Sequence, residues 1–460
     1  MNGFAFASLP RVLRGVSLLI GMIFLAAAFP ALAATAPAPA HAHDAIPPAL
    51  RDAIHRTLGD GWTQQQQVTE ADPQFDPEFG YAVALHGRTA MIGAQQAEIG
   101  DNTSQGAVYV YTQADDGTWS RTQKLVADDG QSADTFGHAI AFEGNTALIG
   151  AYAALVGENF SQGAVYVFTL ANGTWTQTQK LVANDGQMFE NFGYSIGLHG
   201  TTALIGADAA TIGENSVQGA VYEFTFADGT WTQGQKLSAS DGGIGDIFGY
   251  SIAFDGTTAI IGAYANNLYQ GAVYVFGRSG GKWAESQKLV ADDGAPNAYF
   301  GYATALSGST LLVGAWGASP DGNDTQGEAY VFTESDGTWT QSQTLVADDG
   351  TDQVQSKFGH AVALEGTSAL IGADGVDSAT GAVYAFDLMD GTWTQTQKFY
   401  ANDAAPADQF ANPVTLDGNT ALIGSFLWLS PESQMPGSAY FFTRAPTDVV
   451  FADGFDGATP

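Results

Sequence analysis

Cysteine is absent from all 460 residues of this chain. Without thiols the chain has no disulfides, no thiolate nucleophile, no cysteine-ligated metal site and no cysteine for a lipoprotein anchor. Basic residues are scarce as well, with 15 Lys and Arg against 48 Asp and Glu and a net charge of −33. A surface this acidic repels nucleic acid and anionic lipid, so we expect no nucleic-acid partner.

The N-terminus has the pattern of a secretory signal, which we assign to residues 1–33. Arg11 and Arg14 precede the apolar run Val16–Ala28, and the small residues of Ala31–Ala33 are typical of a cleavage site. The apolar run is shorter than the roughly 20 residues of a membrane-spanning helix, and no other segment is a candidate. We therefore expect a secreted protein that is periplasmic, cell-surface or extracellular, with no membrane span in the mature chain.

The rest of the chain divides by composition. Residues 34–59 are rich in Ala, Pro and His and predict a flexible linker followed by a short helix. Residues 60–444 carry one repeated phrase, and residues 445–460 form a tail. The phrase contains Phe-Gly, Ile-Gly-Ala, Gln-Gly-Ala-Val-Tyr-Val-Phe and Gly-Thr-Trp-Thr-Gln. It is repeated with steps of 57, 56, 56, 52, 58 and 52 residues from Phe79. A period of this size indicates a repeat architecture.

Each copy contains four short strand signals bounded by turn residues. In the second copy they are Gly137–Phe142, Thr146–Ala151, Gly163–Phe168 and Trp175–Val182, with two-residue turns at Glu143-Gly144 and Asn172-Gly173. Such runs predict antiparallel hairpins. We call the four strands A to D. The third is apolar on both faces, so we expect it to be buried on both sides.

The strand count predicts a closed ring. An extra D-like strand begins at Trp62, whereas the last copy ends at its third strand, Ser438–Phe442. We therefore expect an all-β, seven-bladed β-propeller of four-stranded antiparallel blades, closed by the N-terminal strand joining the last blade. Closure removes the exposed edges of the sheet. An open solenoid would leave the extra strand unexplained.

Phe-Gly, Ile-Gly-Ala and Gly-Ala-Val-Tyr-Val-Phe, with Trp-x-x-x-Gln-Lys-Leu-x-Ala-x-Asp-Gly before each Phe-Gly, resemble the bacterial FG-GAP repeat. This repeat is similar to the blade unit of integrin α-subunit head propellers. The resemblance implies calcium in the A–B loops, but here each A–B connection is a tight turn with at most one acid, such as Glu143-Gly144 or Asp255-Gly256. Calcium takes six to eight oxygen ligands, so we expect no calcium and no other cofactor.

One acidic residue recurs shortly before each Phe-Gly. Because Asp-Gly is a common turn sequence, we expect these side chains to accept backbone N–H groups. A weak cation site is the alternative. The positions are Asp72, Asp129, Asp185, Asp241, Asp293, Asp349 and Asp403.

A second set of positions begins the first strand of each copy and should surround the mouth of the central channel. In integrin heads, aromatic residues here grip a cationic side chain of a partner, and aromatic faces attract cations. Plugging of the channel is an equally open interpretation. The positions are Tyr81, His138, Tyr194, Tyr250, Tyr302, His360 and Asn412.

A third set begins the variable B–C loops, which should emerge on the same face as the D–A loops. Loops on a rigid scaffold commonly carry recognition, and aromatic side chains also suit carbohydrate stacking. The positions are Gln95, Tyr152, Asp208, Tyr264, Trp316, Asp374 and Phe426, with Trp428 nearby.

Other repeated positions predict packing. We assign Trp119, Trp175, Trp231, Trp283, Trp339 and Trp393 to the core between blades, and the Gly-Ala of the second strand to close backbone approach. Catalysis has little support, because no His-Glu-x-x-His motif and no phosphate loop occurs, and His138 and His360 occupy positions held by Tyr in other copies.

The sequence thus predicts a monomeric, non-catalytic recognition scaffold of the cell adhesion type. Its partner would be a protein or a carbohydrate at the cell surface, bound through the D–A and B–C loops. A multivalent lectin, and a hydrolase or lyase with acids at the channel mouth, remain alternatives.

Overall fold

The computed structural model describes residues 61–70, 78–349, 355–426 and 437–444, which all fall in one compact unit. The signal assigned to 1–33, the linker and short helix of 34–59, and the tail 445–460 lie outside the described residues. Among the residues that are described, no helix has the length and apolar character that crossing a membrane requires.

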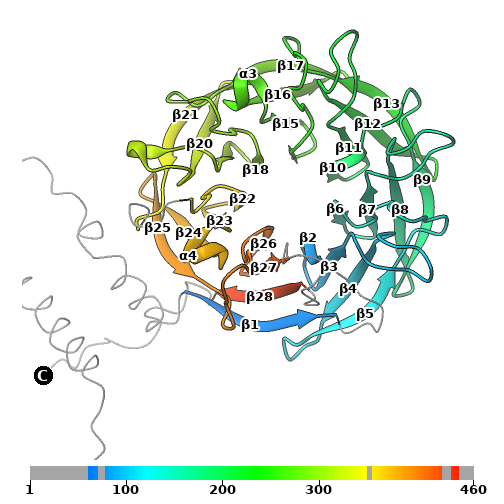
Figure 1. Ribbon diagram of the computed structural model, residues 1–460, viewed down its shortest axis with the longest axis horizontal. Coiled ribbons are helices and arrows are strands. Elements are labelled where there is room, and N and C mark those ends of the chain that lie inside the picture. The colour runs from blue at the N-terminus through cyan, green and yellow to red at the C-terminus, as the bar shows by residue number, and fades with distance from the viewer. Residues whose placement is uncertain (1–60, 71–77, 350–354, 427–436, 445–460) are drawn as a thin grey trace, which may run out of the picture. The chain divides into compact units, whose positions relative to one another are not determined.

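Seven four-stranded antiparallel sheets are arranged as the blades of a ring, as the sequence predicted (Figure 1). The innermost strands, A, are β2 (Phe79–His86), β6 (Ile140–Glu143), β10 (Phe192–His199), β14 (Ile252–Phe254), β18 (Ala303–Ser307), β22 (Ala361–Glu365) and β26 (Val414–Asp417). The B strands are β3 (Thr89–Ala94), β7 (Thr146–Ala151), β11 (Thr202–Ala207), β15 (Thr258–Ala263), β19 (Thr310–Ala315), β23 (Ser368–Ala373) and β27 (Thr420–Ser425).

The C strands are β4 (Ala107–Gln113), β8 (Ala164–Ala171), β12 (Ala220–Ala227), β16 (Ala272–Ser279), β20 (Glu328–Ser335), β24 (Ala382–Met389) and β28 (Ser438–Arg444). The D strands, at the rim, are β5 (Trp119–Leu125), β9 (Thr174–Leu181), β13 (Thr230–Leu237), β17 (Lys282–Leu289), β21 (Thr338–Leu345), β25 (Thr392–Phe399) and β1 (Trp62–Thr69). Short helical turns occur in three B–C loops, as α3 (Asn266–Tyr269), η1 (Pro320–Gly322) and α4 (Val376–Ala379).

Turn chemistry sets the hairpins within each blade. Asn172 and Gly173 both have positive φ, which is the type I′ geometry that Asn-Gly favours. The A–B turn of the same blade is Gly144-Asn145, one residue later than predicted, because Glu143 still pairs with Thr146. The first strand is also shorter than predicted and begins at Ile140 rather than Gly137.

The core lies between neighbouring blades. Each described C strand is buried along most of its length on both faces, as predicted, and β8 has five consecutive buried residues. The Phe of each Phe-Gly is fully buried, and Phe136 meets Tyr166 edge-on at 5.6 Å between ring centroids. The predicted core tryptophans are buried as well. Trp119, for example, stacks at 4.3 Å on Phe441 of the adjacent blade.

Blades approach most closely at the Gly of the B strand. A Cβ on Gly150 would lie 2.1 Å from the carbonyl oxygen of Gly193 in the next blade, so no larger residue fits without a backbone shift. The equivalent contact of Gly424 with Gly80 joins the last blade to the first. The expectation that these glycines serve close backbone approach is confirmed.

Ring closure follows the prediction from Trp62. β1 pairs with β28 in antiparallel register from Trp62 opposite Arg444 to Thr69 opposite Ser438. The seventh blade is therefore assembled from both ends of the repeat region.

A second set of bonds runs around the rim from blade to blade. The Gln four residues after each D-strand Trp donates its amide N–H to the backbone C=O of the next blade's Trp and accepts from that residue's backbone N–H. Gln179 bonds Trp231 in this way, at 2.7 and 2.9 Å. The closing member joins Gln397 to Trp62, at 2.9 and 2.6 Å. The remaining pairs are Gln66–Trp119, Gln123–Trp175, Gln235–Trp283, Gln287–Trp339 and Gln343–Trp393.

We call the two hydrogen bonds between Gln397 and Trp62 the closing clamp. Removing the clamp should destabilise the protein. Gln397→Ala leaves the buried backbone N–H and C=O of Trp62 without partners, so we expect the free energy of unfolding to fall by about 2 kcal/mol. Urea titration followed by circular dichroism measures it. Gln65→Ala is the matched control, because Gln65 is exposed and its amide contacts only Thr63. Equal losses for the two variants would contradict the role of the clamp.

Candidate functional site

Three of the four acids in the A–B turns bond to the backbone of the neighbouring blade, whereas Asp255 accepts from backbone N–H groups of its own turn. Glu143 accepts from the N–H of Gly200 at 2.7 Å, and Glu365 accepts from Gly418 at 2.6 Å. Asp417 accepts in the same way from Gly87, across the closure of the ring. These carboxylates therefore link successive turns.

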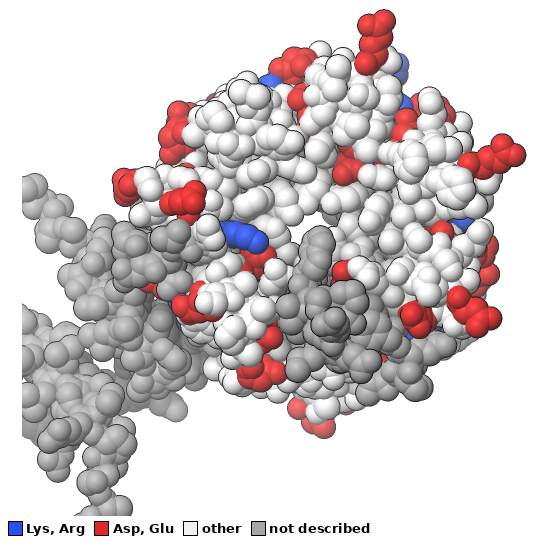
Figure 2. All heavy atoms as spheres, viewed as in Figure 1, with Lys and Arg blue, Asp and Glu red and all other residues white. Residues whose placement is uncertain are grey.

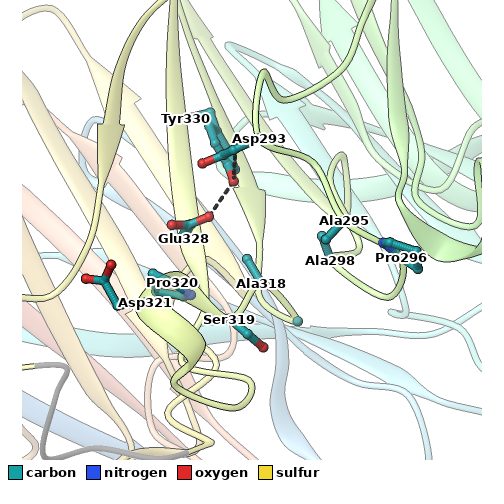
Figure 3. Close-up of a pocket in the computed structure, with 11 residues that line it drawn as sticks. Asp293, Ala295, Pro296, Ala298, Ala318, Ser319, Pro320, Asp321, Glu328 and Tyr330 are labelled. Carbon is teal, nitrogen blue, oxygen red and sulfur yellow. Dashed lines mark hydrogen bonds between the residues drawn. The ribbon is translucent and has the colours of Figure 1, made fainter.

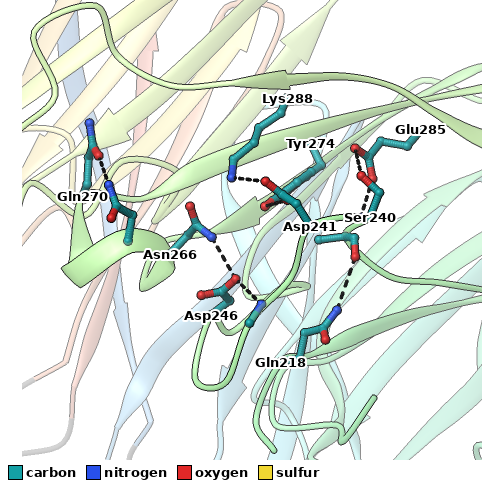
Figure 4. Close-up of polar contacts among 12 residues, drawn as sticks. Gln218, Ser240, Asp241, Asp246, Asn266, Gln270, Tyr274, Glu285 and Lys288 are labelled. Carbon is teal, nitrogen blue, oxygen red and sulfur yellow. Dashed lines mark hydrogen bonds and ion pairs between the residues drawn. The ribbon is translucent and has the colours of Figure 1, made fainter. Parts of the chain in front are cut away.

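The Asp residues that recur before each Phe-Gly lie at the seams between blades. In the fourth blade, Asp241 accepts from Lys288 Nζ at 2.7 Å and from the Tyr274 hydroxyl at 2.7 Å (Figure 4). Asp129, Asp185 and Asp349 each bind the corresponding Lys at 2.7 to 2.8 Å. The partner is thus a Lys and a Tyr of the next blade, a role that turn chemistry did not predict.

Two members of this set face a blade that has Thr344 or Gln67 in place of the lysine. Asp403 accepts from Gln67 at 2.7 Å, and Asp293 accepts from Tyr330 at 2.9 Å. Asp72 lies outside the described residues. Among the described residues, no group of three or more His, Asp or Glu side chains has the arrangement of a metal site.

The residues predicted at the channel mouth form a chain of contacting rings. The centroid distances are 5.0 Å for Tyr81–His138, 4.5 Å for His138–Tyr194, 5.1 Å for Tyr194–Tyr250, 4.8 Å for Tyr250–Tyr302 and 4.7 Å for Tyr302–His360. Each comes from the start of a blade's innermost segment, so the seven-fold repeat brings them together. We call this set, with Asn412, the collar.

The first residues of the B–C loops pack onto the collar. Tyr152 meets His138 at 4.5 Å, Tyr264 meets Tyr250 at 4.5 Å, and Phe426 meets Tyr81 at 4.9 Å. The second and third predicted sets are therefore one aromatic site. Trp428 lies outside the described residues.

The loops that carry these residues contact one another. Phe136 N–H, at the end of a D–A loop, bonds to Gln105 C=O at the end of a B–C loop, at 2.8 Å. Leu155, in the following B–C loop, donates to Asp134 in the same D–A loop. This D–A loop thus bridges two B–C loops. We call the surface formed by the D–A and B–C loops the loop face.

Burial keeps the histidines of the collar neutral. It lowers the pKa of His138 to about 3, and its Nδ1–H donates to Gln95 Oε1 at 2.8 Å. Burial also lowers the pKa of His360. Conversely, burial raises the pKa of Asp208 to about 6, although Asn191 donates to it at 3.0 Å.

Within the described part of the chain, three buried polar atoms of the collar and its neighbours have no hydrogen-bond partner: Trp316 Nε1, His360 Nδ1 and Asp374 Oδ1. The other oxygen of Asp374 lies 3.7 Å from Lys357 Nζ and 3.9 Å from His360 Nδ1. A buried carboxylate, a partly exposed ammonium and an aromatic ring thus lie together beside the collar.

The collar extends outward between the fourth and fifth blades. The ring centroid of Tyr299 lies 4.3 Å from that of Trp316, on which it stacks, and 5.5 Å from that of Tyr269. Tyr299 and Tyr269 each also contact Tyr264. Tyr269 and Tyr299 were not predicted. The available signal was that Tyr299 precedes Phe300 where the other copies carry different residues.

Gly193-Tyr194-Ser195-Ile196-Gly197 has the Gly-x-Ser-x-Gly spacing of a hydrolase nucleophile. That chemistry needs a sharp strand-to-helix turn with an exposed hydroxyl. Here Ser195 lies within β10, and its hydroxyl donates to the Gly249 carbonyl at 2.6 Å. Ser195 therefore serves blade packing.

Because burial raises the pKa of Asp208, replacing this residue with Asn should stabilise the protein at high pH. The folded pKa lies above the ordinary value of 3.8, so the neutral form is favoured in the fold and stability is lost as pH rises through about 6. We expect Asp208→Asn to stabilise by about 2 kcal/mol at pH 8 and to have little effect at pH 4. Thermal unfolding at both pH values measures it. The exposed Asp228→Asn should change stability by less than about 0.5 kcal/mol at either pH.

The hydrogen bonds of the A–B turns lead us to expect that chelating agents will not change the thermal stability of the protein. Because the acids of these turns already bond to backbone N–H groups of the next blade or, for Asp255, of its own turn, we expect no structural calcium there, and EDTA should leave the melting temperature unchanged. Differential scanning calorimetry with and without EDTA, followed by calcium addition, tests this. A fall of several degrees that calcium reverses would contradict it.

A comparison with curated proteins finds no significant match. The family model described as FG-GAP repeat matches the chain seven times, at residues 62–111, 119–168, 175–224, 231–276, 283–332, 339–386 and 393–442. These matches cover more than half of the chain, and each spans the D strand of one blade and strands A to C of the next. The chain therefore belongs to the FG-GAP repeat family.

Proposed function

We propose that this chain is a secreted, non-catalytic recognition scaffold that binds a protein through the loop face of its propeller. The observation that carries this proposal is the exposure of large apolar side chains on the loops. Phe160, Phe189, Ile244 and Leu268 lie in B–C or D–A loops and are 61, 61, 71 and 75% exposed. Apolar side chains gathered on one face are typical of interaction surfaces.

The chemistry of these side chains favours a protein over a carbohydrate. Leu268, Ile244 and Met188 are aliphatic and exposed, whereas sugars are bound mainly by aromatic faces and polar groups. Aromatic residues are enriched in protein interfaces, and the Tyr264, Tyr269, Tyr299 and Trp316 cluster lies beside Leu268. A carbohydrate, bound by stacking on the same rings, is the alternative partner.

Charge indicates the kind of protein. Acidic side chains are distributed around the rim of one face of the ring, with few basic side chains among them (Figure 2). Complementary charge steers association, so a partner with Lys and Arg on its surface fits best. Placement outside the cytoplasm is supported by the signal pattern of residues 1–33.

The buried histidines support recognition rather than hydrolysis. His138 is neutral and donates to Gln95, and His360 packs between Tyr302 and Trp316. In this setting neither is disposed to exchange protons with a bound substrate.

If the loop face binds a protein partner, replacing its exposed apolar residues should weaken that binding. Leu268→Ser combined with Tyr269→Ser removes exposed apolar area from α3, so recovery of the partner from cell envelope and medium should fall at least about tenfold, since 1.4 kcal/mol of lost contact is enough. Affinity capture with quantitative mass spectrometry measures it.

Phe226→Ser is the control. Phe226 is 42% exposed but lies near the end of β12, beside the C–D turn and away from the loop face. Equal capture by wild type and the loop variant, or specific binding on a glycan array without protein capture, would contradict a protein partner at this face.

A further inference from the structure

A pocket of about 330 Å³ opens on the loop face where the loop between β17 and β18 meets the loop between β19 and β20 (Figure 3). Asp293, Asp321, Glu328 and Tyr330 are its main polar residues. The rest of its lining is small, including Ala295, Pro296, Ala298, Ala318 and Pro320. We call it the blade-5 pocket.

The equivalent place in four other blades is occupied by a lysine side chain. The Nζ atoms of Lys180, Lys236, Lys288 and Lys398 lie 2.7, 2.8, 2.7 and 2.7 Å from the seam Asp. They also lie 5.1, 4.9, 5.2 and 5.1 Å from the ring centroid of the C-strand Tyr. Asp and Tyr at this seam therefore hold an ammonium by charge and by cation–π attraction. Figure 4 shows one such seam, at Asp241, Tyr274 and Lys288.

The blade-5 pocket has the equivalent Asp293 and Tyr330, but no lysine is present at the position that supplies the ammonium in four other blades. Thr344 occupies the position of the lysine in β21. Glu328 replaces the Ala that lies two residues before the Tyr in five other blades, such as Ala272 before Tyr274. Relative to its sister seams, the site has thus lost one positive charge and gained one negative charge.

The hydroxyl of Tyr330 now contacts two carboxylates. It lies 2.9 Å from Asp293 Oδ1 and also bonds to Glu328 Oε2. A phenol has a single proton and can donate to one of them, so the other acceptor needs a proton or a cation. Glu328 is 7% exposed, and burial together with the nearby Asp293 raises its pKa.

We propose that the blade-5 pocket binds a primary alkylammonium group, the lysine side chain of a protein partner. The ammonium takes the place that Lys288 fills in the neighbouring blade, donating to Asp293 and Glu328 over the ring of Tyr330. The alanines and prolines of the lining contact its aliphatic stem. The proposal rests on the proposed function only for the source of the lysine.

An ammonium suits the site better than calcium does. Calcium takes six to eight oxygen ligands, and the described residues hold no group of three or more acids arranged for a metal. The sister seams, in contrast, show how Asp and Tyr in this fold accommodate an ammonium. Two residues that line the pocket, Ala298 and Gly317, adjoin Tyr299 and Trp316 of the aromatic cluster in the chain.

The test uses a lysine side chain without a partner protein. Nα-acetyl-lysine methylamide is titrated into the purified protein by isothermal calorimetry, with its Nε-acetyl derivative as the uncharged control. We expect saturable binding of the amine at one site per chain, weakened by salt, and no binding of the acetylated probe. Binding of neither probe, or of both equally, would overturn the proposal.

Variants locate the site. Thr344→Lys restores the residue of the sister seams, so it should fill the pocket, lower the affinity for the amine at least about tenfold and raise the melting temperature. Thr340→Lys adds the same charge at an exposed position of β21 and should change the affinity by less than about twofold. Glu328→Ala, which also restores a sister residue, should weaken binding without unfolding. Undiminished binding to both Thr344→Lys and Glu328→Ala would overturn the assignment.

The converse experiment transplants the site. Ala272→Glu with Lys288→Thr gives blade 4 the two differences of blade 5, and the stoichiometry should rise from one amine to two. If calcium binds but the amine does not, the pocket is a metal site and the proposal fails. Because the amine is a free probe, its failure is distinguishable from a failure of the loop face to capture a protein.

Discussion

The bonds between each D-strand Gln and the Trp backbone of the next blade hold the ring together at its rim. A β-sheet normally ends in an edge of unpaired N–H and C=O groups. Here the outermost strand of every blade gives one N–H and one C=O to the amide of its neighbour, and Gln397 completes the circle at Trp62. Near the axis, the close contact of Gly150 with Gly193 and its equivalents sets how tightly the blades approach. The rim and the axis together constrain the inclination of each blade.

This frame explains why the repeated residues are structural and the exceptional ones are candidates for function. Each blade needs its Phe, Tyr, Trp, Gln and seam Asp to pack against the next, so these positions have little freedom. Packing between blades constrains fewer residues on the loop face, because its loops connect strands and bridge neighbouring blades. It is there that Leu268 and Tyr269 are exposed and that Thr344 and Glu328 convert a filled seam into a pocket. A closed ring with fixed seams thus tolerates one altered seam without losing its architecture.

Much of this fold could be predicted from the sequence, because the same pattern of strands and turns occurs in seven copies. The period, the Asn-Gly and Asp-Gly turns and the extra strand at Trp62 were enough to predict the blades and their closure. The collar was predicted for the same reason, since the first residue after each Phe-Gly must lie near the axis. The lysine partners of the seam Asp were not, because Asp241 and Lys288 are 47 residues apart and meet only across a seam. Gly193–Gly197 has the spacing of a hydrolase nucleophile, but Ser195 lies within β10 and its hydroxyl bonds to the Gly249 carbonyl.

The amino-acid sequence was sufficient for properties that depend on local pattern: strand period, turn type, blade number, and which residue begins each inner strand. The partners of each charge and the position of cavities were decided by tertiary structure. Whether Tyr330 meets one carboxylate or two depends on the approach of the loop after β17 to the C strand of the following blade. That approach is set by packing around the whole ring, and no window of sequence contains it.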